Sequence, residues 1–163
     1  MHRVVVTGYG IVSPIGLTAQ ETWESLLACR TGIGPLTLFD ASDQDTKVAA
    51  EVKNFDAETL LDRRATRRMD RKEMFANVAA REAIQHSGLE ITDENRRRIG
   101  MSISSAFGGI GSMVEEISTL ALEGHKAVNP LSLFKFMTTS PYVSIGYELR
   151  GPSFSVASAC ATG

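Results

Sequence analysis

The apolar positions of this chain follow two spacings in alternation, and that alternation predicts the class of fold. Short β-branched or apolar runs predict three strands, at residues 3–7, at residues 99–105 and directly before Cys160. Helical spacing predicts helices that end at Gly32, Gly88 and Gly124, and a further helix that begins at Pro141. Strands that alternate with helices indicate an α/β protein with a largely parallel sheet, without a linker or a repeat.

The first predicted helix has the clearest start signal. Thr18 and Glu21 have the spacing of a capping box, in which each satisfies a backbone N–H group at the helix start. Trp23, Leu26 and Leu27 then form an apolar stripe along one face. The pattern therefore predicts an amphipathic helix that packs through this stripe.

The second predicted helix begins at Asp70 with Glu73 and runs through Ser87. It is rich in alanine, and small side chains suit close packing on both sides of a helix. Residues 33–55, between these two helices, have the composition of loop and edge structure.

A Gly8-x-Gly10 pair follows the first predicted strand, which is predicted to be buried. A dinucleotide-binding loop also begins this way, but Ser13 stands where its third glycine belongs and Pro14 follows where a helix should already run. The incomplete pattern argues against that loop. An unrelated nucleotide-binding domain stays an alternative, for which nucleotide-dependent thermal stabilisation is the test.

Composition narrows the classes of function. Of the 163 residues, 43% are hydrophobic and 22% charged, and the formal net charge of −2 gives no reason to expect nucleic acid or a membrane surface as partner. No apolar run approaches the roughly 20 residues that span a bilayer, and the N-terminus reads as a strand rather than a signal peptide. Cys29 and Cys160 form no CxxC pair, which argues against a zinc site and a disulfide framework and makes a reducing cytoplasm the default location. We expect no metal and no cofactor.

One run of charge stands out, with Arg63, Arg64, Arg67 and Arg68 within six positions. The simplest interpretation is a solvated charged surface. The functional interpretation is a docking site for an anionic partner, because guanidinium forks bind phosphate and carboxylate groups well.

The strongest candidate for chemistry is Cys160. It follows a short β-type run and is surrounded by alanine, serine and glycine, which let a ligand come close. A cysteine between a strand and a helix meets unpaired N–H groups that favour the thiolate, as an acyl-transfer nucleophile requires. The alternative is a small cysteine that only packs. None of the histidines, His2, His86 and His125, has a pattern that recommends it as the proton-handling partner.

Several motifs, in the right order, resemble the β-ketoacyl-acyl-carrier-protein synthases, and most of all the type II elongating enzymes of fatty-acid synthesis. The opening segment RVVVTGYGIVSPIG spans residues 3–16, and the shorter motifs are RMD at 68–70, SGL at 87–89, RIG at 98–100 and LRGPS at 149–153. The segment SACATG at 158–163 resembles the active-site segment of these enzymes.

The resemblance implies a thiolase-like fold of α/β/α/β/α layers, of which residues 1–163 are the N-terminal part, incomplete at the C-terminus, and a homodimer. It implies that Cys160 takes the acyl chain as a thioester, that malonyl on an acyl carrier protein is decarboxylated, and that the carbanion attacks the thioester. Two histidines and a lysine of the family lie downstream of the cysteine and are absent from these residues. We therefore expect the 163-residue chain alone to lack condensing activity.

Other positions also carry expectations from the resemblance. Arg64, Arg67 and Arg68 fall where the family presents basic residues to the phosphopantetheine-bearing acyl carrier protein. Phe107 and Phe134 fall in segments that line or approach the acyl-chain pocket in relatives, with core packing as the alternative for Phe107. A non-catalytic partner of the chain-length-factor type and a polyketide ketosynthase stay open as alternatives, although chain-length factors usually lack the cysteine.

Overall fold

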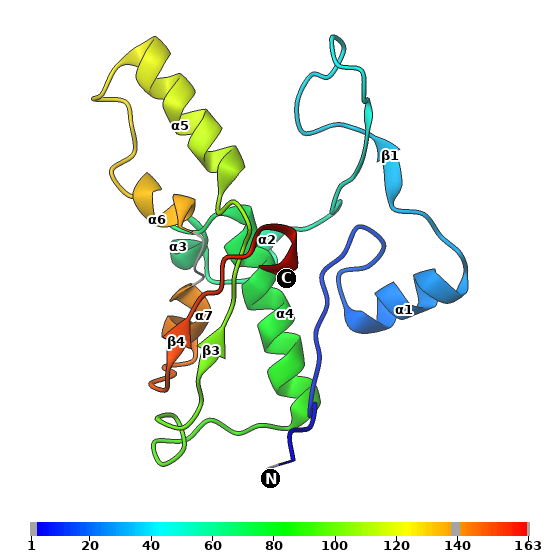
Figure 1. Cartoon of the computed structure of the whole chain (residues 1–163), viewed down its shortest axis with the longest axis vertical. Coiled ribbons are helices and arrows are strands. Elements are labelled where there is room, and N and C mark those ends of the chain that lie inside the picture. Colours follow the sequence, from blue (N-terminus) through cyan, green and yellow to red (C-terminus); the bar gives the residue numbers. More distant parts are fainter. Residues whose placement is uncertain (1–2, 138–140, 163) are drawn as a thin grey trace. The chain divides into compact units, whose positions relative to one another are not determined.

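The computed structural model describes residues 3–137 and 141–162 (Figure 1). By its internal contacts the chain divides into two compact units. The first unit holds Met1–Asp56 and Val78–Leu89, and the second holds Ala57–Asn77 and Glu90–Gly163. Helix α4 (Arg71–Ser87) contributes residues to both units.

The first unit contains α1 (Ala19–Leu27) and an antiparallel pair of β1 (Ile33–Pro35) with β2 (Val48–Ala50), in which Ile33 lies opposite Ala50. The predicted cap of α1 is confirmed. The Thr18 hydroxyl accepts a hydrogen bond from the backbone N–H of Glu21 at 3.1 Å, and the Glu21 carboxylate accepts one from the N–H of Leu17 at 2.7 Å.

The packing face predicted for α1 is wrong. Trp23, Leu26 and Leu27 are exposed, and the side of α1 that is buried carries Ala19, Thr22 and Ser25. Hydrogen bonds hold this side in place. The Ser25 hydroxyl donates to the carbonyl of Ile15 at 2.7 Å, and the Thr22 and Ser13 hydroxyls lie 3.0 Å apart. Hydroxyl contacts with the Ser13–Gly16 turn therefore orient α1 more strongly than its apolar stripe does.

The end of α1 also differs from the prediction. The helix stops at Leu27, and Cys29, not Gly32, takes the left-handed conformation just beyond it, with φ of 50°.

The buried strand predicted at residues 3–7 is also wrong. Val4 and Val6 are 95% and 88% exposed, and within the described chain residues 3–12 join no β-ladder. β-Branched residues favour an extended backbone, but a strand also needs a partner whose N–H and C=O groups complete the pairing. Here the segment is held against α4 instead. The Glu82 carboxylate accepts hydrogen bonds from the N–H groups of Ile11 and Ala19, at 2.9 and 2.8 Å.

Gly8 and Gly10 make that contact with α4 possible. A Cβ added to Gly8 would lie 2.3 Å from the carbonyl oxygen of Ala83, and one on Gly10 would lie 2.0 Å from that of Ala79. Real Cβ atoms do not approach oxygen so closely, so only glycine fits. The glycine pair is thus explained by close packing on the small residues of α4.

The second unit contains the remaining elements. These are α2 (Ala57–Leu60), α3 (Arg63–Thr66), the first turns of α4, β3 (Met101–Ser102), α5 (Ile110–Glu123), α6 (Ser132–Phe136), α7 (Pro141–Gly146), β4 (Ser153–Phe154) and the 3₁₀ turn η1 (Ala159–Thr162). Strands β3 and β4 lie side by side and parallel, with Met101 opposite Ser153 and Ser102 opposite Phe154 (Figure 1). This pair confirms the predicted parallel pairing, although the ladder is shorter than the predicted runs.

Two helix ends in the second half of the chain are as predicted. Gly88 follows α4 with φ of +66°, and Gly124 follows α5 with φ of +85°. Glycine adopts this left-handed region without a steric penalty, so it ends helices readily. Ser140, predicted as the cap of the last helix, lies outside the described residues.

In the part of the chain that the structure covers, no helix has both the length and the apolar character needed to span a bilayer.

Candidate active site

Cys160 lies in η1, six residues beyond the end of β4, and its side chain is exposed. Two hydrogen bonds close the turn around it. The backbone N–H of Ser158 donates to the Thr162 hydroxyl at 2.8 Å, and the N–H of Ala161 donates to the carbonyl of Ser158 at 3.1 Å. A single 3₁₀ turn therefore stands where the sequence predicts a helix start. The thiol is presented at a turn after a β-segment rather than packed in a core.

The residue before the cysteine has an unusual backbone. Ala159 has φ of 51°, in the left-handed region that disfavours residues with a side chain. A non-glycine residue held there costs about 1–3 kcal/mol and persists only when its surroundings impose it. Such strain is common next to reactive groups, and it turns the chain sharply at Cys160.

The loop that carries Phe107 packs directly on the C-terminal end of α6. A Cβ added to Gly108 would lie 2.1 Å from the carbonyl oxygen of Phe136, and one on Gly109 would lie 2.1 Å from that of Lys135. The segments of Phe107 and Phe134 are therefore neighbours. Phe107 is 74% exposed and Phe134 46%, so neither side chain packs in the core of this unit.

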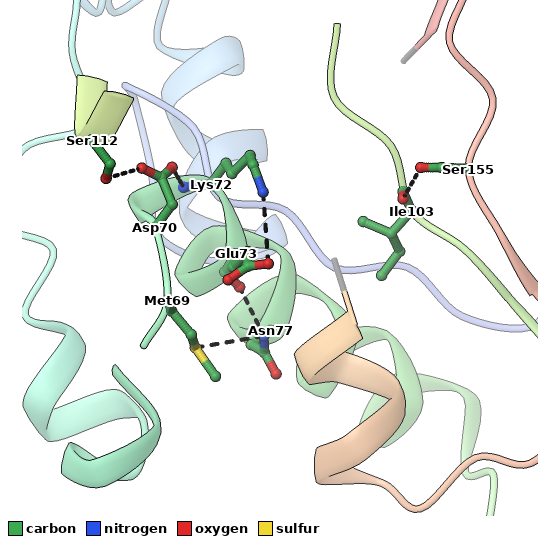
Figure 2. Close-up of polar contacts among 8 residues, drawn as sticks. All are labelled: Met69, Asp70, Lys72, Glu73, Asn77, Ile103, Ser112 and Ser155. Atoms are coloured by element: carbon green, nitrogen blue, oxygen red, sulfur yellow. Dashed lines mark hydrogen bonds and ion pairs between the residues drawn. The ribbon is translucent and has the colours of Figure 1, made fainter. Parts of the chain in front are cut away.

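Asp70 links the start of α4 to the same loop. Its carboxylate accepts a hydrogen bond from the N–H of Lys72 at 3.0 Å, which caps α4, and another from the Ser112 hydroxyl at 2.6 Å (Figure 2). A Cβ on Gly109 would come within 2.8 Å of this carboxylate. Asp70 thus joins the first turn of α4 to the first turn of α5, which directly follows the Phe107 loop.

Glu73 is the most deeply buried charged residue of the unit. Its side chain is fully inaccessible, and neither carboxylate oxygen has a hydrogen-bond partner among the described residues. The nearest cation is the Lys72 ammonium group, with 3.7 Å between Nζ and Oε1. Burial raises the pKa of the Glu73 carboxyl. Burial, and next the charge of Glu73, raise the pKa of Tyr142 on α7, so the two side chains share one environment.

The arginine cluster lies on and after α3, and all four side chains are exposed. Arg63 forms an ion pair with Glu58, with 3.4 Å between Nε and Oε2. For Arg64, Arg67 and Arg68, no ion pair is found within residues 3–137 and 141–162. These three guanidinium groups are therefore available to a partner, whereas Arg63 is already engaged.

Two of the three histidines have simple structural surroundings. The ring of His86, near the end of α4, lies 4.2 Å from that of Tyr9, and His125 is exposed in the turn after α5. His2 lies outside the described residues. The described residues hold no cluster of histidine, cysteine and carboxylate side chains that could bind a metal ion.

Sequence reasoning missed two serines that lie just beyond the strands. Ser104 follows β3 and Ser155 follows β4, and their hydroxyl oxygens are 2.9 Å apart. They are 51 positions apart in the sequence, and only the alignment of two parallel strands brings them together. A serine in each of two predicted parallel strands, near the end of the strand, is the signal that could have indicated them.

Comparison with known proteins agrees with this geometry. The family described as "Beta-ketoacyl synthase, N-terminal domain" matches residues 1–163. The 3-oxoacyl-[acyl-carrier-protein] synthase 2 of Coxiella burnetii is 40% identical over 164 residues, which cover 99% of this chain and 40% of the relative. The chain thus spans about 40% of the length of the curated relatives that it matches.

Solved structures show the same fold. A β-ketoacyl synthase from Burkholderia phymatum matches with a TM-score of 0.80 and 26% identity, over 100% of this chain and 41% of that one. The complex AntDE:AntF, a type II polyketide acyl carrier protein with its ketosynthase, matches with a TM-score of 0.77 and 21% identity, over 97% of this chain and 42% of that one. With its thiolase-like α/β fold, the chain belongs to the β-ketoacyl synthase family, whose N-terminal domain it matches along its whole length.

Proposed function

We propose that the protein is an acyltransferase of fatty-acid elongation, a β-ketoacyl-acyl-carrier-protein synthase that uses Cys160 as its nucleophile. Residues 1–163 form the N-terminal part of its thiolase-like domain. The observation that carries the proposal is the exposed thiol of Cys160 in the turn beyond β4, in a chain 40% identical to a 3-oxoacyl-[acyl-carrier-protein] synthase 2.

The reaction consists of two transfers. The Cys160 thiolate attacks the acyl thioester of the first carrier protein, the phosphopantetheine thiol leaves, and the acyl chain is held as a thioester on Sγ. Malonyl on a second carrier then loses carbon dioxide, and its carbanion attacks the acyl thioester. The Cys160 thiolate leaves, and the β-ketoacyl product stays on the carrier. No cofactor enters this scheme.

The exposed position of Cys160 supports the first transfer, because the bulky carrier-bound thioester must reach Sγ. Ala161 directly follows Cys160, and its small side chain leaves room for the acyl group.

The direct test is acyl transfer to Cys160 in the complete protein. Incubation with an acyl-carrier-protein thioester is expected to add the mass of one acyl group, which peptide mapping should locate on Cys160. Cys29 is the internal control, because it is also an exposed free thiol but lies in the other unit. A protein of the non-catalytic chain-length-factor type would acquire no acyl group at Cys160, and this result would reject the proposal.

The carrier protein is proposed to dock on Arg64, Arg67 and Arg68. Their exposure and the lack of an ion pair among the described residues support this role, because a guanidinium group in water is free to bind an anionic partner. The AntDE:AntF complex supports a carrier protein as partner in a related fold.

Charge reversal tests this docking surface. Arg67→Glu/Arg68→Glu in the complete protein is expected to weaken binding of the acyl carrier protein by about tenfold at low salt, and by less as salt increases. Binding is measured by titration at several salt concentrations. Arg97→Glu/Arg98→Glu makes the same change of charge at exposed positions in the same unit and should leave affinity nearly unchanged. Equal effects of the two double variants would refute a specific docking site.

Phe107 and Phe134 are proposed to line the acyl-chain pocket. The close packing of the Phe107 loop on α6 and the exposure of both rings support this, because rings outside the core are free to contact an acyl chain. The protein is further proposed to be a cytoplasmic homodimer. The apolar side chains that α5 leaves exposed support a protein partner; they are Ile110, Val114, Ile117 and Leu120.

A further inference from the structure

We propose that Ser104 and Ser155 are positioning residues for Cys160, because their hydroxyl groups continue the pairing of β3 and β4 toward the cysteine. The inference rests on the proposed role of Cys160 and adds residues to the same site. All three residues belong to one unit, so the geometry between them is defined within that unit.

Backbone hydrogen bonds hold the segments of β3 and β4 together up to the point where both strands end. The N–H of Gly151 donates to the carbonyl of Ile99 at 3.1 Å, and the N–H of Met101 donates to that of Pro152 at 2.8 Å. The register then pairs Ser102 with Phe154, where both strands end. Beyond this point, the segment that leads to Cys160 needs another source of support.

Three hydrogen bonds of the two serines provide that support. The Ser155 hydroxyl donates to the carbonyl of Ile103 at 2.8 Å (Figure 2), and the N–H of Val156 donates to the Ser104 hydroxyl oxygen at 2.9 Å. The two hydroxyl oxygens are 2.9 Å apart. A hydroxyl has one proton, and that of Ser155 is used toward Ile103, so Ser104 is the donor in the third bond. Each hydroxyl thus supports the other.

These bonds end close to the nucleophile. Only residues 157–159 lie between Val156 and Cys160, and on the far side the Ser158–Thr162 hydrogen bond closes the turn. The left-handed backbone of Ala159 needs such restraint on both sides, because it is not a conformation that alanine adopts freely. The serine pair is the restraint on the strand side.

We expect the serine network to affect the reactivity of Cys160 rather than the binding of the carrier protein. A turn held in one conformation keeps the sulfur in the position from which it attacks. If the segment before the turn loosens, the thiol spends less time in that position. The carrier-docking arginines lie on and after α3 and are not part of this network.

The test uses Ser155→Ala in the complete protein. We expect the rate of alkylation of Cys160 by iodoacetamide and the kcat of condensation to fall by about tenfold, with KM for the carrier protein changed less than about twofold. Alkylation of Cys29 should keep its rate. Ser155→Thr retains the hydroxyl and should restore both Cys160 rates, and Ser153→Ala, at an exposed position of β4, should change neither.

Ser104→Ala removes a different bond of the same network and keeps the test valid if Ser155→Ala does not fold. A similar fall in both Cys160 rates is expected, and the double variant should lose little more than either single variant, because one network is broken in each case.

Unchanged Cys160 rates in both alanine variants would overturn the inference. An equal fall at Cys29, no rescue by threonine, or losses that multiply in the double variant would also overturn it. If Cys160→Ala still condenses acyl and malonyl groups, the proposed function fails instead, whatever the serine variants do.

Discussion

Replacing Cys160 by alanine is expected to lower the condensation rate of the complete protein by about 10³-fold or more, because the residue that holds the acyl chain is removed. Alanine keeps the Cβ and fits the turn, since Ala159 and Ala161 already flank the position. The exposed side chain contributes little to packing, so the fold should stay intact. The measurement is formation of β-ketoacyl-carrier product from acyl- and malonyl-carrier proteins.

Cys29→Ala is the matched control for this variant. Cys29 is also a free, exposed thiol, but it lies just past α1 in the other unit. The Cys29→Ala protein should retain the parental condensation rate. The backbone at position 29 is left-handed, with φ of 50°, and this conformation suits alanine no better than cysteine. A Cys160→Ala protein with substantial condensing activity would show that another group accepts the acyl chain. An equal loss in the Cys29 variant would point to a general effect of thiol removal.

Local signals in the sequence were sufficient for most helix ends. The Thr18 cap, the start of α4 after Asp70 and the glycines after α4 and α5 are all found as predicted. Each is decided by a few neighbouring residues through hydrogen bonds or a left-handed backbone. Interactions between neighbouring residues can therefore be predicted from the sequence alone.

Packing faces and strand pairing could not be read in the same way. The stripe of Trp23, Leu26 and Leu27 predicted the wrong face of α1, because hydroxyl contacts with the turn that precedes the helix decide the orientation. The valines at the N-terminus predicted a buried strand, but no partner for it exists within the described residues. Both outcomes depend on what lies opposite, and hydrophobic periodicity does not contain that information.

The candidate site also combines one residue that the sequence predicts with others that only the fold brings together. Cys160 could be proposed from its small neighbours and the preceding β-type run, and it lies in a turn beyond a strand. Ser104 with Ser155, and Asp70 with Ser112, could not, because each pair joins segments that are 42 or more positions apart. Only the fold brings these side chains within hydrogen-bonding distance.

Gly10→Ala is expected to destabilise the first unit by about 3 kcal/mol, at the upper end of what overpacking costs. The new Cβ would lie 2.0 Å from the carbonyl oxygen of Ala79 and 2.8 Å from the backbone nitrogen of Ala83, and both are main-chain atoms of α4 that cannot rotate away. The segment must therefore leave α4, which also breaks the hydrogen bonds of Ile11 and Ala19 to Glu82. The measurements are the denaturation midpoint and amide hydrogen exchange of residues 3–19.

Gly34→Ala is the control, because it lies in the same unit and its added Cβ would meet only the Lys53 ammonium nitrogen at 3.7 Å, an ordinary contact. Its effect on stability should be within about 1 kcal/mol, since neither a clash nor a left-handed backbone opposes alanine there. Gly8→Ala should resemble Gly10→Ala, because its Cβ would lie 2.3 Å from the carbonyl oxygen of Ala83. If Gly10→Ala is as mild as the control, the N-terminal segment does not lie against α4, and close packing does not explain the two glycines. If faster exchange is limited to residues 3–19 and α4, the damage is located at this contact.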